Sequence, residues 1–303
     1  MPTTASRSAP RSAGRAGAAA LTQKYATWTA WVDSGDWQQT TSTSSLALPA
    51  NASDIMVLAL DPDVSVGQLV HVTSRDQVLA ARMLRLANSA YCAPLEEITT
   101  ISDAVVRLGT ASVRNVVLAT CMASRLQQGG VYGPQGRGLA DHGIGAAFLS
   151  QVVAKHVGAN SEEAFLYGLV HDLGKLLVLQ LSKDYASAGG GWVRPEELAA
   201  VMERRHAEFG GRLLNEWRLP HLIQDPVVYH HQPEVCQDHP AEAVIAYVAN
   251  RLSHRYGFGC RPDPDADLLA DPVVTSLEIN VAWLAEMDAR APALMQGGVA
   301  AFA

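Results

Sequence analysis

The sequence predicts an all-α protein, arranged as a two-lobed helical bundle. From about residue 46 onward, apolar residues recur at the spacing of amphipathic helices. No segment shows the sustained alternation of apolar and polar residues between turn signals that is typical of half-buried strands. A glycine-rich segment, 129–138, interrupts the helical pattern and is typical of a flexible connector. These observations predict two helical lobes, 46–128 and 139–260, with a helical extension at 261–303.

The first lobe is predicted to consist of short amphipathic helices. In the segment 76–90 the apolar residues form one stripe, while the arginines face elsewhere. The helix at 102–108 is expected to begin at Ser102, a residue type that caps helices, and to end before Gly109, a typical helix stop. The predicted helices of this lobe are 52–60, 65–72, 76–90, 102–108 and 113–126.

The second lobe is predicted to contain longer helices. Three consecutive glycines at 189–191 separate two of them. In the extension, the Pro/Asp-rich segment 262–267 predicts a turn, and 273–287 predicts a closing helix. The predicted helices of this lobe are 139–157, 161–180, 195–204, 206–217, 221–231 and 241–256.

Composition excludes several classes of protein. The chain of 303 residues has 48% hydrophobic and 17% charged residues, which fits a globular protein. Its net charge of −7 argues against a general nucleic-acid binder, which needs a basic face. Four cysteines without C-x-x-C spacing indicate reduced thiols and a cytoplasmic location. No apolar run approaches the ~20 residues of a spanning helix, so we expect no membrane segment.

The first 45 residues differ from the rest and are predicted to form a flexible tail rich in Ala, Ser and Arg. Residues 1–32 contain basic residues and no acidic ones, which also suits a transit peptide. A disordered tail is the preferred interpretation, because no arginine-bearing amphipathic stripe is present. Trp28, Trp31 and Trp37 suit a segment that docks on a partner or on the body of the protein, and both alternatives stay open.

An adjacent His171–Asp172 pair interrupts the apolar segment 161–180 and is the most informative feature of the chain. At helical spacing, Lys175 shares a stripe with this pair, and the small Gly168 lies beside it. An unpartnered buried charge costs several kcal/mol or more. The pair therefore either makes hydrogen-bonded or ionic contacts or holds a metal ion.

Four further histidines lie at suggestive positions in the second lobe: His142, His206, His230 and His231. Neutral imidazoles and carboxylates are good ligands for iron, manganese, zinc and nickel. Ligands from several helices of a bundle can surround one or two such ions. A single histidine on a helix is more often a surface residue or a hydrogen-bonded core residue than a metal ligand, so the prediction of a metal site depends on the set.

The order H…HD…H…HH in a helical chain resembles the HD superfamily of metal-dependent phosphohydrolases, and more closely its HDOD branch. The similarity extends from about residue 46 to residue 256. It includes RLANSA at 85–90, HAEFGGRLLNEWRLP at 206–220 and VVYHH at 227–231. The resemblance implies an HD-domain-like second lobe in a bacterial signal-transduction protein.

The resemblance also implies a metal-ligand set with one altered member. The last ligand of the superfamily is an aspartate, and Asn250 stands at its expected position. A carboxamide oxygen is neutral, so the site loses one negative charge and we expect weaker metal binding or a different ion. The residues that match ligands are His142 as the first histidine, His171 and Asp172 as the HD pair, His206, His230 and His231 as the additional histidines of the HD-GYP branch, and Asn250.

Two functions follow from the resemblance. The preferred one is a non-catalytic regulatory module that acts through a protein partner, without nucleic acid or membrane, and keeps the cluster as a remnant or a structural metal site. The alternative is a metal-dependent phosphohydrolase in which Asp172 holds the metal and Lys175 neutralises a phosphoryl oxygen; otherwise Lys175 forms an ion pair with Asp172. The altered Asn250 favours the first, and QPEV after His231 in place of DGxGYP argues against cyclic-di-GMP hydrolysis.

Overall fold

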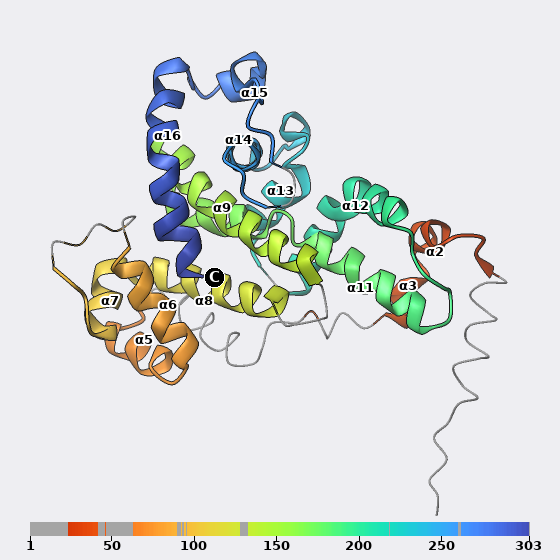
Figure 1. The fold of residues 1–303 in the computed structure, drawn as a ribbon, viewed down its shortest axis with the longest axis horizontal. Coiled ribbons are helices and arrows are strands. Elements are labelled where there is room, and N and C mark those ends of the chain that lie inside the picture. The colour runs from red at the N-terminus through yellow and green to blue at the C-terminus, as the bar shows by residue number, and fades with distance from the viewer. Residues whose placement is uncertain are drawn as a thin grey trace, which may run out of the picture.

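A computed structural model gives the fold of the chain (Figure 1). It describes residues 24–41, 46, 63–89, 92, 94, 96–127, 133–217, 219–259 and 262–302. Within these ranges every regular element is helical, which confirms the predicted all-α class. The predicted helix at 52–60 lies outside the described residues.

The first helices of the first lobe begin where a side chain caps the backbone. Ahead of α5 (Val66–Thr73), Ser65 and Gln68 form a reciprocal capping box. Ahead of α6 (Gln77–Ala87), Asp76 accepts hydrogen bonds from two backbone N–H groups of the first turn, both at 3.0 Å. Both helices occupy the predicted segments because their caps and their apolar stripes agree.

The next helix, α7 (Ile101–Leu108), ends at Gly109 as predicted, and the glycine has φ 83°. The predicted cap at Ser102 is wrong. Thr100 has the extended backbone of a cap, and its hydroxyl accepts the N–H of the third helical residue at 3.0 Å. After Gly109 the chain enters α8 (Thr110–Gln127), which packs against α6, α7 and the second lobe.

Two polar side chains fasten α6 to its surroundings. Asn88 of the RLANSA segment donates to the carbonyl of Ile98 and accepts the N–H of the same residue, both at 2.7 Å. The buried Arg82 donates to the carbonyl of Thr120 on α8 at 3.1 Å and to that of Phe302 at 2.9 Å. The first lobe is thereby attached both to α8 and to the end of the described chain.

The second lobe is centred on α9 (Gly133–Val157), α10 (Ser161–Val170) and α14 (Pro240–Arg255), which pack on one another. Glycines allow the close approach of α9 and α10. A Cβ added at Gly143 would lie 2.8 Å from the Leu169 carbonyl oxygen, closer than real Cβ contacts. The buried apolar residues of both lobes form one continuous core cluster.

The start of α9 changes the extent of the predicted connector. Residues 133–138 of the glycine-rich segment belong to this helix, although the sequence predicted a connector over 129–138. Pro134 lies in the first turn, where a proline has no hydrogen bond to lose. Gly138 lies against Gly259 of the loop after α14, since a Cβ on Gly259 would be 3.1 Å from the Gly138 carbonyl. Packing therefore compensates for the low helix propensity of glycine.

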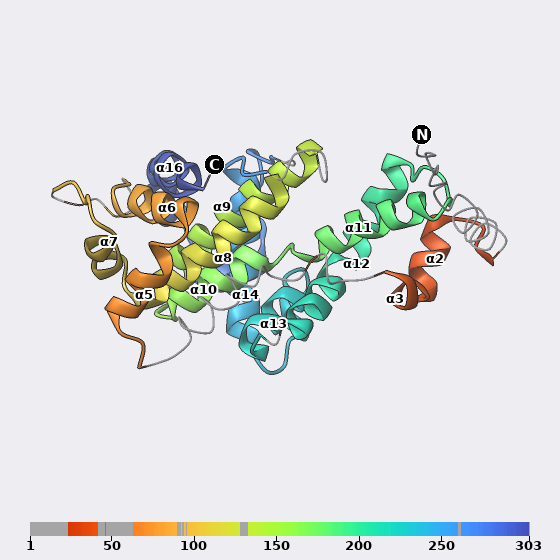
Figure 2. The same ribbon diagram turned by 90° about the horizontal axis from the view of Figure 1, so that it is seen from below.

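The predicted helix at 161–180 is wrong in one respect, because it is two helices. α10 ends at Val170, and α11 (Gly174–Ser187) begins after a three-residue turn. In this turn the backbone bonds span three residues instead of four, as from Leu173 N–H to the Val170 carbonyl at 2.9 Å. The change of direction separates α11 from the core of the second lobe (Figure 2).

The predicted helices at 195–204 and 206–217 are also wrong, because they are one helix, α12 (Pro195–Glu216). No helix-breaking residue lies near the predicted interruption, where the sequence is rich in Glu and Arg. α12 packs on α11 and on α13 (His221–Tyr229). The glycines at 189–191 separate α11 from α12, as predicted.

The C-terminal extension contains α15 (Pro272–Thr275) and α16 (Val281–Ala293) in place of the single predicted helix at 273–287. Glu278 between them has φ 59°, a left-handed conformation that ends a helix. Asn280 then caps α16 by accepting two N–H groups at 3.0 and 3.1 Å.

Part of the predicted flexible tail is folded. α2 (Trp28–Ser34) and α3 (Trp37–Thr40) bury their three tryptophans, and α2 contacts both α11 and α12. Trp37 meets Phe209 of α12 edge-on at a centroid distance of 5.4 Å. Of the two alternatives for the tryptophans, docking on the body of the protein is the one found. Burial of large aromatic side chains explains it, because each removes much apolar surface from water.

The helices give the molecule an elongated shape. In Figure 2 the first lobe lies at one end, the α9–α10–α14 group in the middle, and α11, α12, α2 and α3 form an arm at the other end. Within the described residues one stretch, Ser161–Ser187, is long and apolar enough to cross a membrane, but 89% of its apolar window is buried inside the protein. Core helices pass the same test, and this stretch is the broken pair α10–α11.

Candidate metal centre

The HD pair lies in the turn between α10 and α11. His171 is 1% exposed and Asp172 is 3% exposed. Gly174 follows directly, and a Cβ at this position would lie 1.8 Å from the carbonyl oxygen of His206. Only glycine permits this approach of α11 to α12, and the approach brings His206 next to Asp172.

The first triad consists of His142, His171 and Asp172, from α9 and the turn. Their candidate ligand atoms all lie within 4.8 Å of one another. The Nε2 atoms of His142 and His171 are 3.1 Å apart, and they lie 3.3 and 3.6 Å from Asp172 Oδ2. All three residues are buried.

The second triad consists of His206, His230 and His231, from α12 and the end of α13. Their candidate ligand atoms also lie within 4.8 Å of one another. His206 Nε2 lies 3.2 Å from His230 Nε2 and 2.9 Å from His231 Nε2. His206 and His230 are buried, whereas His231 is exposed.

Asp172 lies between the two triads. Its Oδ2 faces the first triad, and its Oδ1 lies 3.3 Å from His206 Nε2 and 3.8 Å from His230 Nε2. A carboxylate with one oxygen toward each group has the arrangement of a bridge between two cations. The five histidines that the sequence singled out therefore lie in two groups on either side of the Asp172 carboxylate.

The buried histidines are oriented by backbone carbonyls. In each of them Nδ1 donates to a carbonyl oxygen, so the neutral ring carries its lone pair on Nε2, the atom that faces the cluster. Metal-binding histidines are held in the same way. The pairs are His142 with Phe258 at 3.2 Å, His171 with Gly168 at 2.7 Å, His206 with Met202 at 2.5 Å and His230 with Val227 at 2.7 Å.

Burial keeps the imidazoles of His142, His171 and His230 neutral. It lowers the pKa of His142 to about 3, and it holds the pKa of His171 below and that of His230 well below the ordinary value. His231 is exposed as a residue, but its ring is partly buried against His206, and this burial and the neighbouring His206 lower its pKa to about 4. A neutral imidazole has a free lone pair, which is the form that binds metal.

Asp172 is ionised in this setting. Burial favours its neutral form, but the ammonium group of Lys175, the largest opposing effect, holds its pKa well below the usual value. The Lys175 ammonium forms an ion pair with Asp172 Oδ2, the contact that the sequence gave as the alternative role of this lysine. The site therefore combines one carboxylate with neutral nitrogen donors.

The contacts between imidazoles show whether this donor set suits a cation. In the Nε2–Nε2 contacts His142–His171 and His206–His230, at 3.1 and 3.2 Å, both nitrogens carry lone pairs when both Nδ1 atoms are protonated. Two facing lone pairs make no hydrogen bond, and an unsatisfied buried acceptor is costly. A cation within each triad satisfies both nitrogens at once, so the residues fit a metal ion.

Asn250 is buried on α14, and its Oδ1 makes no hydrogen bond within the described part of the chain. Ser253 and His254, three and four residues later, both approach His142: Ser253 Oγ lies 3.2 Å from its Nδ1, and the two imidazole rings are 4.8 Å apart. Residues at this spacing share a helix face. Asn250 therefore lies on the side of α14 that faces the first triad, with a free carbonyl oxygen.

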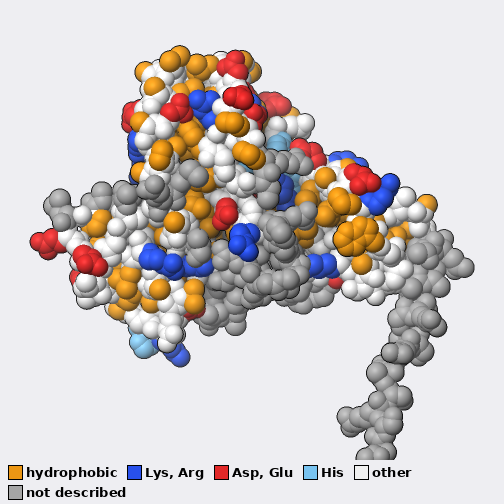
Figure 3. All heavy atoms as spheres, in the orientation of Figure 1, with side chains coloured by type: hydrophobic (Ala, Val, Ile, Leu, Met, Phe, Trp, Pro, Cys, Tyr) orange, Lys and Arg blue, Asp and Glu red, His pale blue; other side chains and the backbone are white. Residues whose placement is uncertain are grey.

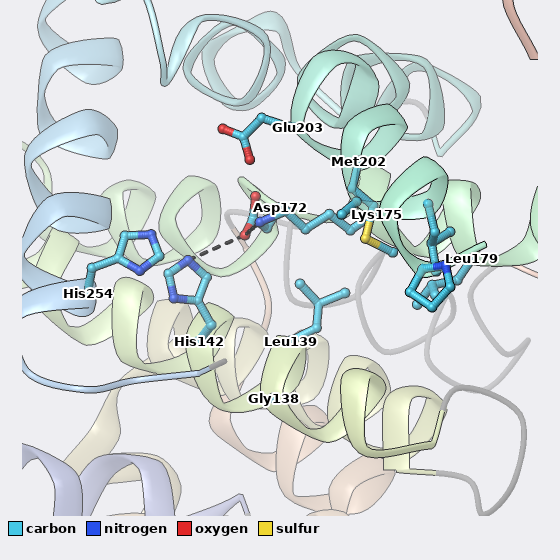
Figure 4. Close-up of a pocket in the computed structure, with 12 residues that line it drawn as sticks. Gly138, Leu139, His142, Asp172, Lys175, Leu179, Met202, Glu203 and His254 are labelled. Atoms are coloured by element: carbon cyan, nitrogen blue, oxygen red, sulfur yellow. Dashed lines mark hydrogen bonds and ion pairs between the residues drawn. The ribbon is translucent and has the colours of Figure 1, made fainter. Parts of the chain in front are cut away.

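A cavity of about 180 Å³ opens onto the first triad. Figure 4 shows Asp172 and Lys175 side by side at its centre, with His142 and His254 on one side and Met202 on the other. The sequence did not single out His254, although its spacing of four residues from Asn250 was a usable signal. The described lining comprises Gly138, Leu139, His142, Asp172, Lys175, Leu179, Pro195, Leu198, Ala199, Met202, Glu203 and His254.

The surface shows how this region is reached. In Figure 3 basic and hydrophobic side chains lie together where the part of the molecule around α14 meets the arm of α11 and α12. The arm and α14 both line the cavity, through residues such as Leu198 and His254. The junction of these two parts is therefore the accessible side of the centre.

Comparison with known proteins identifies the family. The model of the HDOD domain matches residues 46–233, which is more than half of the chain. The chain belongs to the HDOD family. The match includes the first lobe, the second lobe as far as residue 233 and all the histidines of the two triads, whereas α14 with Asn250 and His254 lies beyond its end.

Solved structures agree with the fold. A candidate phosphohydrolase from Shewanella amazonensis has a TM-score of 0.63 at 24% identity, with 85% of this chain and 94% of that one covered. A candidate signal transduction protein from Marinobacter aquaeolei has a TM-score of 0.59 at 21% identity, with 84% and 59% covered. At these identities the similarity is one of fold.

A curated relative, an uncharacterized protein of Treponema pallidum, is 25% identical over 195 residues, or 61% of this chain. The match covers 37% of the Treponema protein, and the chain spans no more than this share of the curated relatives that it matches. Activities and partners of those longer proteins are therefore not carried to this chain.

Proposed function

We propose that this chain is an HDOD signalling module whose second lobe binds transition-metal ions at the two triads, with Asp172 as the shared ligand. The observation that carries the proposal is the convergence of four buried Nε2 lone pairs on both oxygens of one ionised carboxylate. A cluster that no longer binds metal would not require its histidine side chains to be oriented in this way. Family membership and a fold shared with a candidate signal transduction protein support the signalling role.

The donor set favours particular ions. Imidazole nitrogens with one carboxylate suit iron, manganese, zinc and nickel, whereas calcium and magnesium prefer sets of oxygen donors. His142, His171, Asp172 and Asn250 would hold one ion, and His206, His230, His231 and Asp172 the other. With Asn250 in place of an aspartate, the first ion has one negative charge less around it.

Metal analysis of the purified protein tests the proposal. We expect one or two transition-metal ions per chain and a loss of both in Asp172→Ala, because both triads share this carboxylate. Asp265→Ala changes an exposed aspartate and serves as the matched control. If Asp172→Ala keeps the metal content of the parent protein, while circular dichroism shows both to be folded, the proposed centre is wrong.

A metal-dependent phosphohydrolase is the second candidate, and the cavity over Asp172 and Lys175 favours it specifically. A bound transition metal lowers the pKa of coordinated water and so supplies hydroxide near neutral pH. Lys175, 27% exposed in its side chain, faces the cavity and can neutralise a phosphoryl oxygen there. The aspartate holds this lysine in place through their ion pair.

Turnover separates the two candidates. A hydrolase with added Mn²⁺ or Fe²⁺ is expected to cleave phosphate esters, and Lys175→Met to lower the rate by at least 100-fold without loss of metal. Lys183→Met, on the same helix α11, is the control. Metal-loaded protein without turnover on a panel of phosphomonoesters and phosphodiesters would leave the signalling module as the function.

The signalling role requires a protein partner. We infer that the lobes 46–128 and 139–260 act together in presenting a surface to it, since they share one hydrophobic core. Cross-linking in the native cell, followed by mass spectrometry, is the appropriate test. Partner cross-links that persist in Asp172→Ala support a metal-independent adaptor, and the absence of any partner cross-link contradicts the role.

A further inference from the structure

The cavity on the first triad has two different sides. One side carries the polar groups His142, Asp172 and Lys175. The opposite side is formed by apolar side chains, among them Leu179, Leu198 and Met202, from α11 and α12. A ligand that fills this space therefore needs an anionic end and an apolar end, because an apolar wall cannot satisfy a polar group.

The size of the cavity restricts the ligand. Its volume is about 180 Å³, and an apolar cavity of roughly 150 Å³ accommodates one benzene molecule. Sites for larger organic ligands have volumes of roughly 300–1,000 Å³. The space therefore fits one ring or a short branched alkyl group, and it is too small for a dinucleotide.

The charged residues that line the cavity restrict the ligand further. Lys175 is the one Lys or Arg among the described residues that line the cavity, and its ammonium is already paired with Asp172. Glu203 adds a carboxyl group above Asp172, as Figure 4 shows. Di- and triphosphates are usually bound by several cationic groups. A second phosphate in this cavity would meet carboxylates instead, so the lining selects against polyphosphates.

We infer that this cavity binds a compact phosphate ester with a single phosphoryl group, whose one-ring or short alkyl organic part lies on the apolar wall of α11 and α12. The phosphoryl group lies at Lys175 and the first triad, so the inference rests on the metal centre proposed above. The ligand serves either candidate function: it is the substrate of a hydrolase or the small molecule to which a signalling module responds.

Phenylphosphonate is a suitable probe, because it has one anionic phosphorus group and one ring joined by a bond that hydrolysis does not cleave. The purified protein, with its metal content measured, is titrated calorimetrically with phenylphosphonate, inorganic phosphate, pyrophosphate and ATP, and the four affinities are compared. We expect phenylphosphonate to bind at least tenfold more tightly than phosphate, since only its ring reaches the apolar wall. Pyrophosphate and ATP are expected to bind no more tightly than phosphate.

Two matched variants locate the site. Ala199 lines the cavity, whereas Ala200, the next residue of α12, is exposed. Ala199→Leu fills the space of the ring and is expected to lower phenylphosphonate affinity at least tenfold while phosphate affinity changes less than twofold. Ala200→Leu makes the same change in composition and helix propensity and is expected to leave both affinities unchanged.

The possible outcomes separate a failure of the cavity inference from a failure of the proposed metal centre. Metal-loaded protein that binds phenylphosphonate no better than phosphate, or that is insensitive to Ala199→Leu, overturns the inference and leaves the centre intact. Metal-free protein that still binds phenylphosphonate with the expected sensitivity overturns the centre and keeps the cavity assignment. If neither metal nor probe binds, both are wrong.

Discussion

The two triads around Asp172 differ in their contact with solvent. In the first, every member is buried, and His254 of α14 packs against His142. In the second, His206 and His230 are buried but His231 is exposed. The same carboxylate thus joins a group of wholly buried ligands, next to the cavity, to a group that has one exposed ligand. An ion in the second triad is expected to exchange faster, because the exposed His231 can dissociate from it into solvent.

The largest effect that separates the triads is expected from removing one histidine of each. His171→Ala should abolish binding at the first triad and, through the loss of buried contacts, lower stability by roughly 2–5 kcal/mol. His231→Ala should remove only the ion of the second triad and change stability little. Metal-to-protein ratios and thermal unfolding measure both effects.

His221→Ala is the control for these variants, since His221 is 80% exposed in its side chain and outside both triads. It should keep the metal content of the parent protein. Equal metal loss in His171→Ala and His231→Ala, with both variants folded, would show that the two triads bind metal as one unit.

Acid provides the next largest effect. In the metal-free folded protein His142, His171 and His230 are neutral, because burial lowers their pKa, for His142 to about 3. In the unfolded chain they titrate near 6.5, so between about pH 6.5 and pH 3 the unfolded chain binds more protons. The free energy of unfolding therefore falls as the pH falls through this range. At pH 5 the loss from His142 alone is on the order of 2 kcal/mol, and His171 and His230 add to it in the same direction.

Urea unfolding in the presence of EDTA at pH 7, 6 and 5 measures this loss. His142→Leu removes the titrating group whose pKa falls to about 3 and should flatten the dependence by about one proton. A free energy of unfolding that stays constant from pH 7 to pH 5 would contradict the burial of neutral imidazoles.

The fold was predictable wherever local signals decided it. The predicted helices at 65–72 and 76–90 began at the residues that cap α5 and α6, and the predicted stop at Gly109 was correct, because such residues act on the adjacent backbone. The predicted cap at Ser102 was wrong by two residues. The break after Val170 was not predicted, because apolar residues continue at helical spacing on both sides of the HD pair. Its cause is the contact of Gly174 with the α12 backbone, which is remote in sequence.

The candidate site shows the same division. The HD pair departed from its apolar surroundings, and the order of the histidines resembled a family, so the donor set could be collected from the sequence. The role of Asp172 as the group shared by two triads could not, because it depends on which oxygen faces which helix. His254 was missed although its spacing of four residues from Asn250 places both residues on one face of α14.

A substitution at Asn250 tests the difference between the two triads with a smaller expected effect. Asn250→Asp adds a carboxylate on the face of α14 toward the first triad and should raise metal affinity there by about tenfold, with the second triad unchanged. In metal-free protein the added charge lies near Asp172 and should lower stability at neutral pH, because like charges repel in a buried site. Competition with a metal-sensitive dye, followed by urea unfolding with and without metal, measures both.

Asn215→Asp on α12 adds the same charge away from the first triad and is the control for this substitution. An Asn250→Asp variant that binds metal no more tightly than Asn215→Asp would exclude Asn250 from the ligand set.

The smallest effect is expected from the N-terminal helices. Asp33 of α2 accepts hydrogen bonds from Arg204 and Arg205 of α12 at 2.8 and 2.9 Å, next to His206 of the second triad. These contacts are largely exposed, so Asp33→Ala should cost under about 1 kcal/mol. Because α12 carries His206 but no member of the first triad, the variant should speed metal loss to a chelator from the second triad alone.

The control is Glu286→Ala, which breaks a comparable exposed pair with Arg290 on α16 and should leave both rates of metal release unchanged. Equal rates of metal release in the two variants would show that the contacts of α2 with α12 do not stabilise metal binding at the second triad.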